Sequence, residues 1–223
     1  MAEPARAIDE QFSSEEYFQR LLHPVDEAGK RRTALLQATF DAIAELGFEG
    51  LRTRAVAERA GVNVATLHYY FPTKQALIEG LAQFLAAKFV LLHGPAPKPS
   101  GYPALDRLRQ EFFDGEFYFE HEPKMLLVME ELELRAKRDV EVQKVVEMMH
   151  WHWKLGLEQM VEAGVAEGTF RQDLSKDEIL TLLICMMSGA TICRGDEFQF
   201  VKQGIERWLL NEKVWKATRG AEK

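Results

Sequence analysis

The segment Leu51–Leu77, LRTRAVAERAGVNVATLHYYFPTKQAL, constrains the fold of this 223-residue chain more than any other segment. It predicts two short helices joined by a tight turn, because apolar residues at helical spacing stop at Gly61 and resume after Asn63. Glycine adopts the left-handed conformation that ends a helix at little cost, and asparagine is a favoured cap for the next helix. We expect Thr53 to cap the first helix and the second helix to span Val64–Tyr70.

This layout is a helix-turn-helix, in which the second helix lies in the major groove of DNA. An ordinary helical hairpin is the alternative. It is disfavoured because a small residue at the crossing point, Ala57, coincides with Gly61, the apolar plug Val62 and the Asn63 cap. The residues predicted to bind DNA are Thr53, Arg54, Asn63, Val64, Ala65, Thr66, His68, Tyr69, Tyr70 and Lys74. Of these, Thr53, Arg54 and Lys74 are expected at phosphates, and Val64, Ala65, Thr66 and Tyr69 at base edges or the DNA backbone.

The segment Lys30–Leu81 resembles the DNA-binding domain of the TetR family of bacterial transcriptional regulators. The matching residues are Gly47, Thr53, Ala57, Ala60, Gly61, Val62, Thr66, Leu67, Tyr70, Phe71, Thr73, Lys74 and Leu77. The sequence departs from the family at Asn63, where serine is usual, and at His68, where tyrosine is usual. The resemblance covers about a quarter of the chain with specific motifs, and over the remainder it is architectural.

The net charge of −7 argues at first against a nucleic-acid partner. The distribution of charge removes this objection. Residues 29–80 carry seven basic and five acidic side chains, whereas the rest of the chain carries 21 basic and 30 acidic side chains. A chain polarised in this way would present its positive end to DNA phosphates.

Helical periodicity continues along the rest of the chain, and no segment shows the alternation that is typical of a β-strand. The sequence therefore predicts an all-α fold. It consists of an N-terminal three-helix helix-turn-helix domain and a larger C-terminal helical bundle for ligand binding and dimerisation. The expected domains are a partly disordered arm over 1–28, the DNA-binding domain over 29–80, the bundle over 81–215 and a tail over 216–223.

Caps and helix-breaking residues predict the individual helices. The arm contains one short helix from Ser13 or Ser14 to Leu22, with Ser13 and Glu16 at capping-box spacing. His93–Pro103 carries four prolines and is expected to be a linker. The other expected helices are Thr33–Gly47, one from the Thr73 cap to Leu92, Leu105–Glu120, Lys124–Lys137, one from the Asp139 cap to Ala163, Lys176–Arg194 and one from Asp196.

The sequence offers little that points to catalysis or to a metal. His150 and His152 lie two positions apart and so point away from each other on a helix. There is no glycine-rich phosphate loop and no nucleophile elbow. Cys185 and Cys193 are too few for a disulfide scaffold and are expected to stay reduced. We therefore expect no enzyme activity, cofactor or metal, and we expect a cytoplasmic protein, because no apolar run reaches membrane-spanning length.

Large, soft side chains are concentrated in the helices that follow the linker. Methionine and aromatic residues line adaptable apolar pockets, although packing in the core is the alternative for each one. TetR-like proteins hold a small-molecule pocket in this part of the chain, so the resemblance implies an apolar or aromatic effector. The residues expected to bind it are Phe113, Phe117, Met125, Met129, Met149 and Trp153.

The segment Lys176–Arg194 is nearly apolar on all sides and so requires burial on several sides. A central core helix within one subunit is one interpretation. The resemblance favours the other, because the last two helices of TetR-like proteins pair with their copies as a four-helix bundle. The expected dimer residues are Leu180, Leu183, Ile184, Met187, Ile205 and Trp208.

These patterns together predict a dimeric DNA-binding transcriptional regulator, most simply a repressor released from a roughly palindromic operator by a small molecule. Two alternatives stay open at this point. One is an activator, or a regulator that answers to a protein partner without a small ligand. The other is a helical metal-binding enzyme or carrier.

Overall fold

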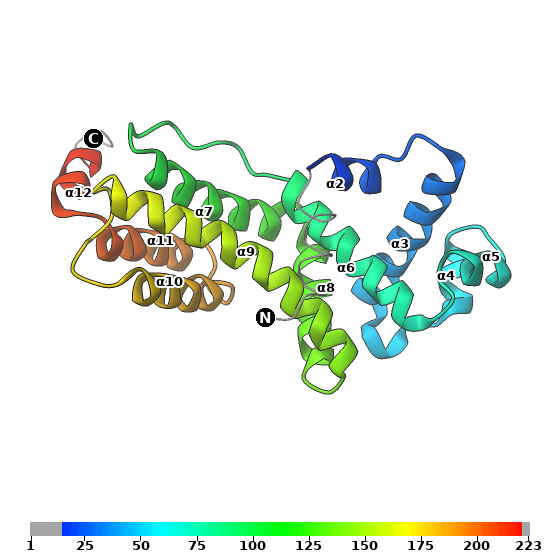
Figure 1. Cartoon of the computed structure of the whole chain (residues 1–223). Coiled ribbons are helices and arrows are strands. Elements are labelled where there is room, and N and C mark those ends of the chain that lie inside the picture. The colour runs from blue at the N-terminus through cyan, green and yellow to red at the C-terminus, as the bar shows by residue number, and fades with distance from the viewer. Residues whose placement is uncertain (1–14, 220–223) are drawn as a thin grey trace. The chain divides into compact units, whose positions relative to one another are not determined.

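A computed structural model describes residues 15–219 of the chain. Within these residues the fold is all-helical, which confirms the predicted class, and Phe170 and Leu210 form an isolated antiparallel bridge. The helices are α2 (Glu15–Leu22), α3 (Glu27–Leu46), the 3₁₀ turn η1 (Phe48–Gly50), α4 (Thr53–Arg59), α5 (Val64–Tyr70), α6 (Lys74–Leu91), α7 (Pro103–His121), α8 (Pro123–Ala136), α9 (Val140–Ala166), α10 (Lys176–Ala190), α11 (Asp196–Leu209) and α12 (Glu212–Arg219) (Figure 1).

The helices form two compact units. The first contains the described residues up to His93 together with Tyr118–Met149, and the second contains Gly94–Phe117 together with the described residues from His150 onward. The expected boundary between domains at residues 80 and 81 falls inside α6, and α8 groups with the first unit.

The core of the first unit is built by α3, α4, α5 and α6. Leu36, Val56 and Leu67 are fully or almost fully buried where these helices meet. Gly80 allows α6 to pack closely against Phe71 and against Leu36 of α3, because a Cβ atom at this position would lie 2.8 Å from the Phe71 ring and 3.0 Å from Leu36. The three helices of the helix-turn-helix are therefore fixed to the long helix α6.

Helix α3 begins earlier than the sequence pattern suggested. Asp26 caps it by accepting a hydrogen bond of 2.7 Å from the amide of Gly29, so the helix starts at Glu27 and not near Thr33. The basic residues 30–32 therefore lie in its first turns, and residues 27 and 28, which the sequence placed in the arm, belong to this helix. An aspartate cap carries the same signal as serine or threonine, but the polar first turns hid it.

Helix α2 packs along α6 and against α3. Phe18 and Leu21 are buried, and the Tyr17 hydroxyl donates a hydrogen bond of 3.0 Å to the side-chain oxygen of Gln83. The Thr33 hydroxyl donates to the carbonyl of Leu21 at 2.7 Å. The expected short helix that ends at Leu22 is thus confirmed. Its predicted cap, Ser13, lies outside the described residues.

Helix α8 is attached to the C-terminal end of α3 by side chains far apart in sequence. The Glu131 carboxylate accepts a hydrogen bond of 2.7 Å from the Phe48 amide. Two ion pairs flank it, Lys124 with Asp41 at 3.0 Å and Arg135 with Glu49 at 2.9 Å. These contacts fix the turn between α3 and α4 to α8.

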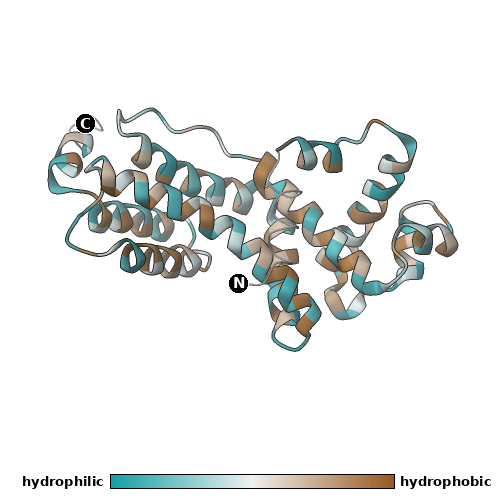
Figure 2. Cartoon of the chain, in the orientation of Figure 1, coloured by the Kyte–Doolittle hydropathy of each residue, from teal (hydrophilic) through white to brown (hydrophobic). Residues whose placement is uncertain are grey.

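The second unit contains residues 103–117 of α7, residues 150–166 of α9, and α10, α11 and α12. Arg109 on α7 makes two hydrogen bonds, of 2.8 and 2.9 Å, to the buried carboxylate of Glu206 on α11. The predicted capping box of Ser175 and Glu178 opens α10 as expected, and Figure 2 shows hydrophobic residues along this helix.

Three predicted bounds in this unit were wrong. Helix α9 continues past the expected end at Ala163 to Ala166, and α10 ends at Ala190, four residues before Arg194. The tail expected from residue 216 is helical up to Arg219, because Val214 and Thr218 are buried on one face of α12.

Candidate DNA interface

The turn between α4 and α5 has the geometry that the sequence predicted. Helix α4 ends at Arg59 with Ala60 as its C-cap, and Gly61 follows with a φ of 69°, in the left-handed region. The amide of Val62 then donates a hydrogen bond of 2.9 Å to the carbonyl of Ala57, which is itself buried at the helix crossing. Glycine is needed here for its backbone conformation and not for space, since nothing lies within 4 Å of the position of its Cβ.

The predicted Thr53 cap was wrong. The N-cap of α4 is Arg52, and Thr53 is the first residue of the helix, where no side chain accepts a capping hydrogen bond. The Arg52 guanidinium instead donates to the carbonyl of Glu49 at 2.6 Å and that of Leu51 at 3.2 Å. The turn η1 places the chain so that α4 starts at Thr53, one residue before the position that a Thr53 cap requires. Thr53 remains half-exposed in the first turn.

Asn63 caps α5 as predicted. Its side-chain oxygen accepts hydrogen bonds from the Thr66 amide at 2.7 Å and from the Thr66 hydroxyl at 3.0 Å. Leu67 is buried on the inner side of the helix. The cap and this single apolar anchor therefore fix both the start of α5 and its rotation about its axis.

The outward face of α5 carries most of the residues predicted to contact bases. Ala65, His68 and Tyr69 are exposed, and Tyr69 is the most open of the large side chains here at 81%. Tyr70 is half-buried and packs edge-on against Tyr69, with ring centroids 5.2 Å apart. Tyr70 therefore supports the exposed Tyr69 ring, and only part of its own surface is open to a partner.

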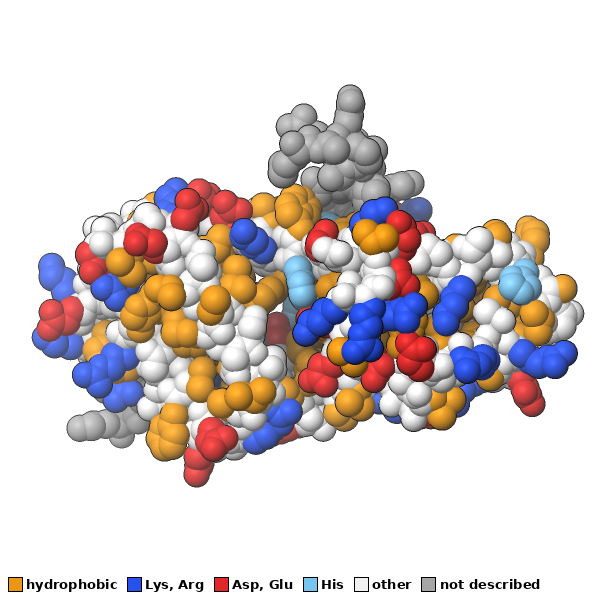
Figure 3. All heavy atoms as spheres, turned by 90° about the horizontal axis from the view of Figure 1, so that it is seen from below, with side chains coloured by type: hydrophobic (Ala, Val, Ile, Leu, Met, Phe, Trp, Pro, Cys, Tyr) orange, Lys and Arg blue, Asp and Glu red, His pale blue; other side chains and the backbone are white. Residues whose placement is uncertain are grey.

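Helix α6 starts at Lys74, shortly after α5 ends at Tyr70. Thr73 caps the helix by accepting a hydrogen bond of 3.0 Å from the Ala76 amide, as predicted. The exposed Lys74 has its ammonium group 5.1 Å from the centroid of the buried Phe48 ring, and the Arg135 guanidinium lies 5.2 Å from that centroid. In the view of Figure 3, Lys and Arg side chains form a row over the first unit.

Not every basic residue of this region is available to phosphates. Arg59 makes two hydrogen bonds, of 2.9 and 2.6 Å, to the Glu45 carboxylate and so joins α4 to α3. This hydrogen bond from Arg59 holds the pKa of Glu45 below its ordinary value. Arg54, by contrast, is exposed in the first turn of α4, where sequence reasoning placed a phosphate contact.

Sequence reasoning missed the residues that support this surface from behind. Arg52 holds the η1 turn, Arg32 lies 5.3 Å from the centroid of the Phe71 ring, and Glu131 binds the Phe48 amide. Only the basic run at residues 30–32 gave a visible signal. The Glu131 contact joins residues 83 positions apart, so no local pattern reveals it.

The six residues predicted to bind an effector are divided between the two units. Phe113, Phe117 and Trp153 belong to the second unit, and Met125, Met129 and Met149 to the first. Met125 is buried and the other five are half-buried. In the second unit the Trp153 ring donates a hydrogen bond of 3.1 Å to Glu111, and the Lys202 ammonium lies 4.3 Å from the centroid of the Phe113 ring. This effector set stays a prediction.

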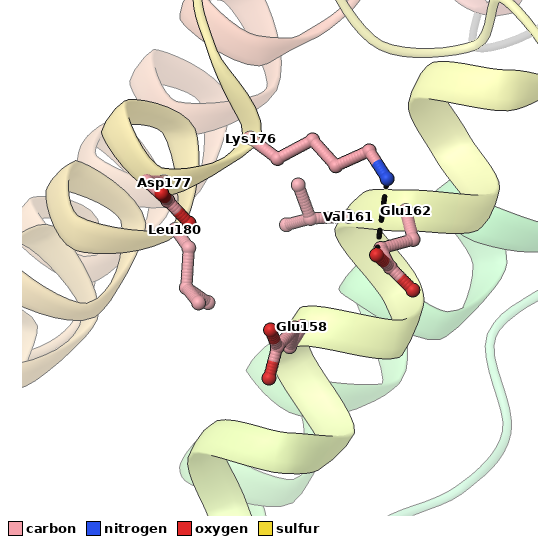
Figure 4. A pocket seen from close by; sticks show the side chains of 6 residues that line it. All are labelled: Glu158, Val161, Glu162, Lys176, Asp177 and Leu180. Carbon is pink, nitrogen blue, oxygen red and sulfur yellow. Dashed lines mark hydrogen bonds and ion pairs between the residues drawn. The ribbon is translucent and has the colours of Figure 1, made fainter.

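A small hollow lies between α9 and α10 in the second unit. It measures about 50 Å³, and it is lined by Glu158, Val161, Glu162, Lys176, Asp177 and Leu180. Figure 4 shows Lys176 reaching from the start of α10 to Glu162 on α9, an ion pair of 3.0 Å. The hollow is acidic and much smaller than pockets for drug-sized ligands, which measure about 300–1,000 Å³. It therefore does not fit the expected apolar effector.

The predicted dimer residues divide into buried and half-buried positions. Leu180, Leu183 and Ile205 are buried within this subunit, so their assignment to a dimer surface is corrected to the subunit's own core. Ile184, Met187 and Trp208 are half-buried, and the Trp208 ring has the Arg171 guanidinium 5.9 Å from its centroid. Helix α11 covers one side of α10, which explains why an almost entirely apolar helix needs no partner on that side.

Other apolar residues of α10 and α11 are exposed. Leu182, Cys185 and Ile192 follow one another at helical spacing along and just beyond α10, and Leu182 and Ile192 are 46% and 84% exposed. Phe200 on α11 is 71% exposed. Figure 3 shows hydrophobic side chains gathered over α10 and α11.

Residues 15–219 also bear on metal binding and on membrane insertion. No group of three or more His, Cys, Asp or Glu side chains in this range is arranged to hold a metal ion. None of the described helices is both long enough and apolar enough to cross a membrane.

Comparison with known proteins supports the identity of the first unit. Residues 35–81 match the family model described as bacterial regulatory proteins, tetR family. The repressor KstR from Rhodococcus jostii is 39% identical over 80 residues, which is 36% of both chains. The class A tetracycline repressor from transposon 1721 of Escherichia coli is 39% identical over 54 residues, 24% of this chain and 25% of that protein. The chain thus aligns with about a third or less of the length of these relatives.

The likeness to solved structures extends over most of the chain. A TetR transcription regulator from Haloarcula marismortui superposes with a TM-score of 0.67, covering 82% of this chain and 99% of the other. The two sequences are 18% identical over this alignment, so this likeness establishes a common fold.

Proposed function

We propose, from the premise that the chain belongs to the TetR family of bacterial regulatory proteins, that it is a transcriptional repressor controlled by a small molecule. The observation that carries this proposal is the outward face of α5. Asn63 sets the start of α5, and the buried Leu67 sets the rotation of the helix about its axis. Ala65, His68 and Tyr69 are thereby left open to a partner. A repressor that binds bacterial DNA acts in the cytoplasm, and we propose that location.

The DNA contacts divide by chemistry. Thr53, Arg54 and Lys74 stand at the exposed starts of α4 and α6, where a hydroxyl or a cation meets phosphate. Residues of α5 enter the major groove and meet the base edges. The Lys74 ammonium is held beside the Phe48 ring, which reduces the freedom that this long side chain loses on binding.

We propose that two copies of the chain bind together. TetR-family regulators typically act as dimers, and the exposed apolar residues of α10 and α11 suit a second copy of the same surface. At Gly189 and Gly204 nothing lies within 4 Å of the position of a Cβ, so a partner helix has room to approach closely. A two-fold dimer would meet a palindromic operator whose half-sites lie one helical turn, or a multiple of it, apart.

The effector would act on the first unit through α6 and α8. Helix α6 starts at Lys74, and α8 holds the Phe48 amide through Glu131, so displacement of either helix moves a DNA-contacting end. Coupling between an effector and an operator is typically worth about 1–3 kcal/mol, or roughly five- to 150-fold in affinity. It is reciprocal, so operator DNA should weaken effector binding by the same factor.

The experiment begins by selecting fragments of genomic DNA with the purified full chain and measuring their affinity at several salt concentrations. Lys74→Ala should weaken binding to all sequences alike, and it should flatten the salt dependence by about one counterion per lost phosphate contact. Lys216→Ala is the matched control, because Lys216 is exposed in α12 and pairs locally with Glu212. A changed sequence preference in Lys74→Ala, with unchanged affinity and salt slope, would contradict the phosphate assignment.

A further inference from the structure

The outward face of α5 lacks the side chains that most often read bases. Residues 64–70, VATLHYY, contain no Arg, Lys, Asn, Gln, Asp or Glu. Guanine is usually read by two hydrogen bonds from Arg or Lys, adenine by two from Asn or Gln, and cytosine by one from Asp or Glu. Helix α5 therefore has to distinguish base pairs by other contacts.

The hydroxyl of Thr66 is already engaged within the protein. It lies 3.0 Å from the Asn63 side-chain oxygen, which also accepts the Thr66 amide at 2.7 Å. An amide oxygen only accepts, so the hydroxyl donates its proton to the cap. The half-exposed Thr66 therefore offers a partner its γ-methyl group and a hydroxyl oxygen that can accept a hydrogen bond but not donate one.

The neighbouring positions offer the same chemistry. Ala65 is exposed and presents one methyl group, and Val64 is half-exposed and presents two. The first turn of α5 is thus a small surface of methyl groups held in place by the Asn63 cap and the buried Leu67. Such a surface gains free energy mainly from an apolar partner, because its side chains have no free hydrogen-bond donor and the Thr66 hydroxyl oxygen is their one acceptor.

Thymine carries the one apolar group on a base edge in the major groove, the methyl group at C5. We propose that the methyl groups of Val64, Ala65 and Thr66 recognise thymine C5-methyl groups, so that each operator half-site carries thymines beneath the first turn of α5. This inference rests on the proposed function, since it assigns the bases that the same DNA-binding surface reads. His68 and Tyr69 in the next turn contribute single hydrogen bonds to bases or phosphates.

Uracil provides a direct test, because it differs from thymine in DNA only by the absence of this methyl group. Duplexes are first selected from a random pool by the full chain, and each thymine of the selected site is then replaced by uracil. Each methyl group that α5 covers should cost about fourfold in affinity, the equivalent of about 0.8 kcal/mol for one buried methyl-sized group. Uracil outside the proposed positions should have no effect.

Two variants of Thr66 separate its methyl group from its hydroxyl. Thr66→Ser keeps the hydroxyl for Asn63 and removes the methyl, so it should bind the thymine site about fourfold more weakly and lose sensitivity to uracil at one position. Thr66→Val keeps a methyl and removes the hydroxyl, so its sensitivity to uracil should persist. Thr181→Ser, an exposed position on α10, is the control, and circular dichroism confirms that each variant is folded.

The outcomes distinguish the inference from the proposed function. If no sequence is enriched from the random pool, the chain does not recognise an operator and both proposals are overturned. If a site is enriched but uracil is tolerated at every thymine, the function stands and methyl recognition is overturned. If the loss of affinity from Thr66→Ser adds in full to the loss from uracil at every thymine position, the role of Thr66 is overturned. If the two losses do not add at one position, Thr66 contacts the methyl group of that thymine.

Discussion

Leu182 and Leu183 on α10 are neighbours in sequence, and their contrasting exposure gives a direct test of the dimer surface. Leu182 is 46% exposed, whereas Leu183 is fully buried in its own subunit. We predict that Leu182→Glu dissociates the dimer into folded monomers, and that Leu183→Glu unfolds the subunit. Sequence reasoning expected Leu183 at the interface; because Leu183 is buried and Leu182 is exposed, we propose this role for Leu182.

The size of each effect follows from burial. Complete burial of a leucine side chain contributes about 1.5–3 kcal/mol, so covering the 46% exposed part of Leu182 contributes about 1 kcal/mol in each subunit. Two copies in a symmetric interface give about 2 kcal/mol, or roughly thirtyfold in the dissociation constant, to which the glutamate adds the cost of a buried charge. At Leu183 the buried unpaired charge costs several kcal/mol, against a total stability of about 5–15 kcal/mol for a typical domain.

Sedimentation velocity at micromolar concentration measures assembly, and thermal circular dichroism measures folding. Leu134→Glu is a matched control, because Leu134 is 50% exposed but lies on α8 in the first unit. If Leu182→Glu sediments as the wild-type dimer with an unchanged dissociation constant, α10 does not form the interface. A monomeric wild type at these concentrations would refute the dimer itself.

Three further predictions concern stability. Asn63→Ala removes the cap of α5 and should cost about 1 kcal/mol in thermal unfolding while Asn63→Ser should not, and equal losses would refute the capping role. Glu131→Ala leaves the Phe48 amide without its acceptor and should cost about 1–3 kcal/mol in denaturant unfolding, whereas an unchanged midpoint would show that α8 does not hold this turn. The pKa of Glu45 is lowered by Arg59, so their contact stabilises the fold above pH about 4.5 and is lost as pH falls through the lowered pKa. Arg59→Gln should therefore lose less stability than wild type on acidification from pH 6 to 3, and identical pH profiles would contradict this.

The parts of the fold that local chemistry determines were predictable from the sequence. Gly61 in the left-handed region, the Asn63 and Thr73 caps, and the capping box at Ser175 depend on residues within three or four positions. The same reasoning failed at Thr53, because the start of α4 is set by the path of the preceding turn η1 and not by which residue is the better cap.

Features that depend on tertiary packing could not be read from the sequence. The apolar residues of α10 surround the helix, so only the position of α11 decides that Leu183 is buried and Leu182 exposed. The attachment of α8 through Glu131 joins distant segments and has no periodic signal. Which residues of α5 face outward was predictable, because a short amphipathic helix with one buried leucine, Leu67, has one defined outer side.

The most direct test of the central claim is the ratio of two affinities at physiological salt. One is the affinity of the purified chain for the genomic fragment that it selects, and the other is its affinity for a scrambled duplex of equal length and composition. A sequence-specific regulator should prefer the selected fragment by about 1,000-fold or more. Equal affinity for the two duplexes would contradict the account, because the α5 face would then read no sequence.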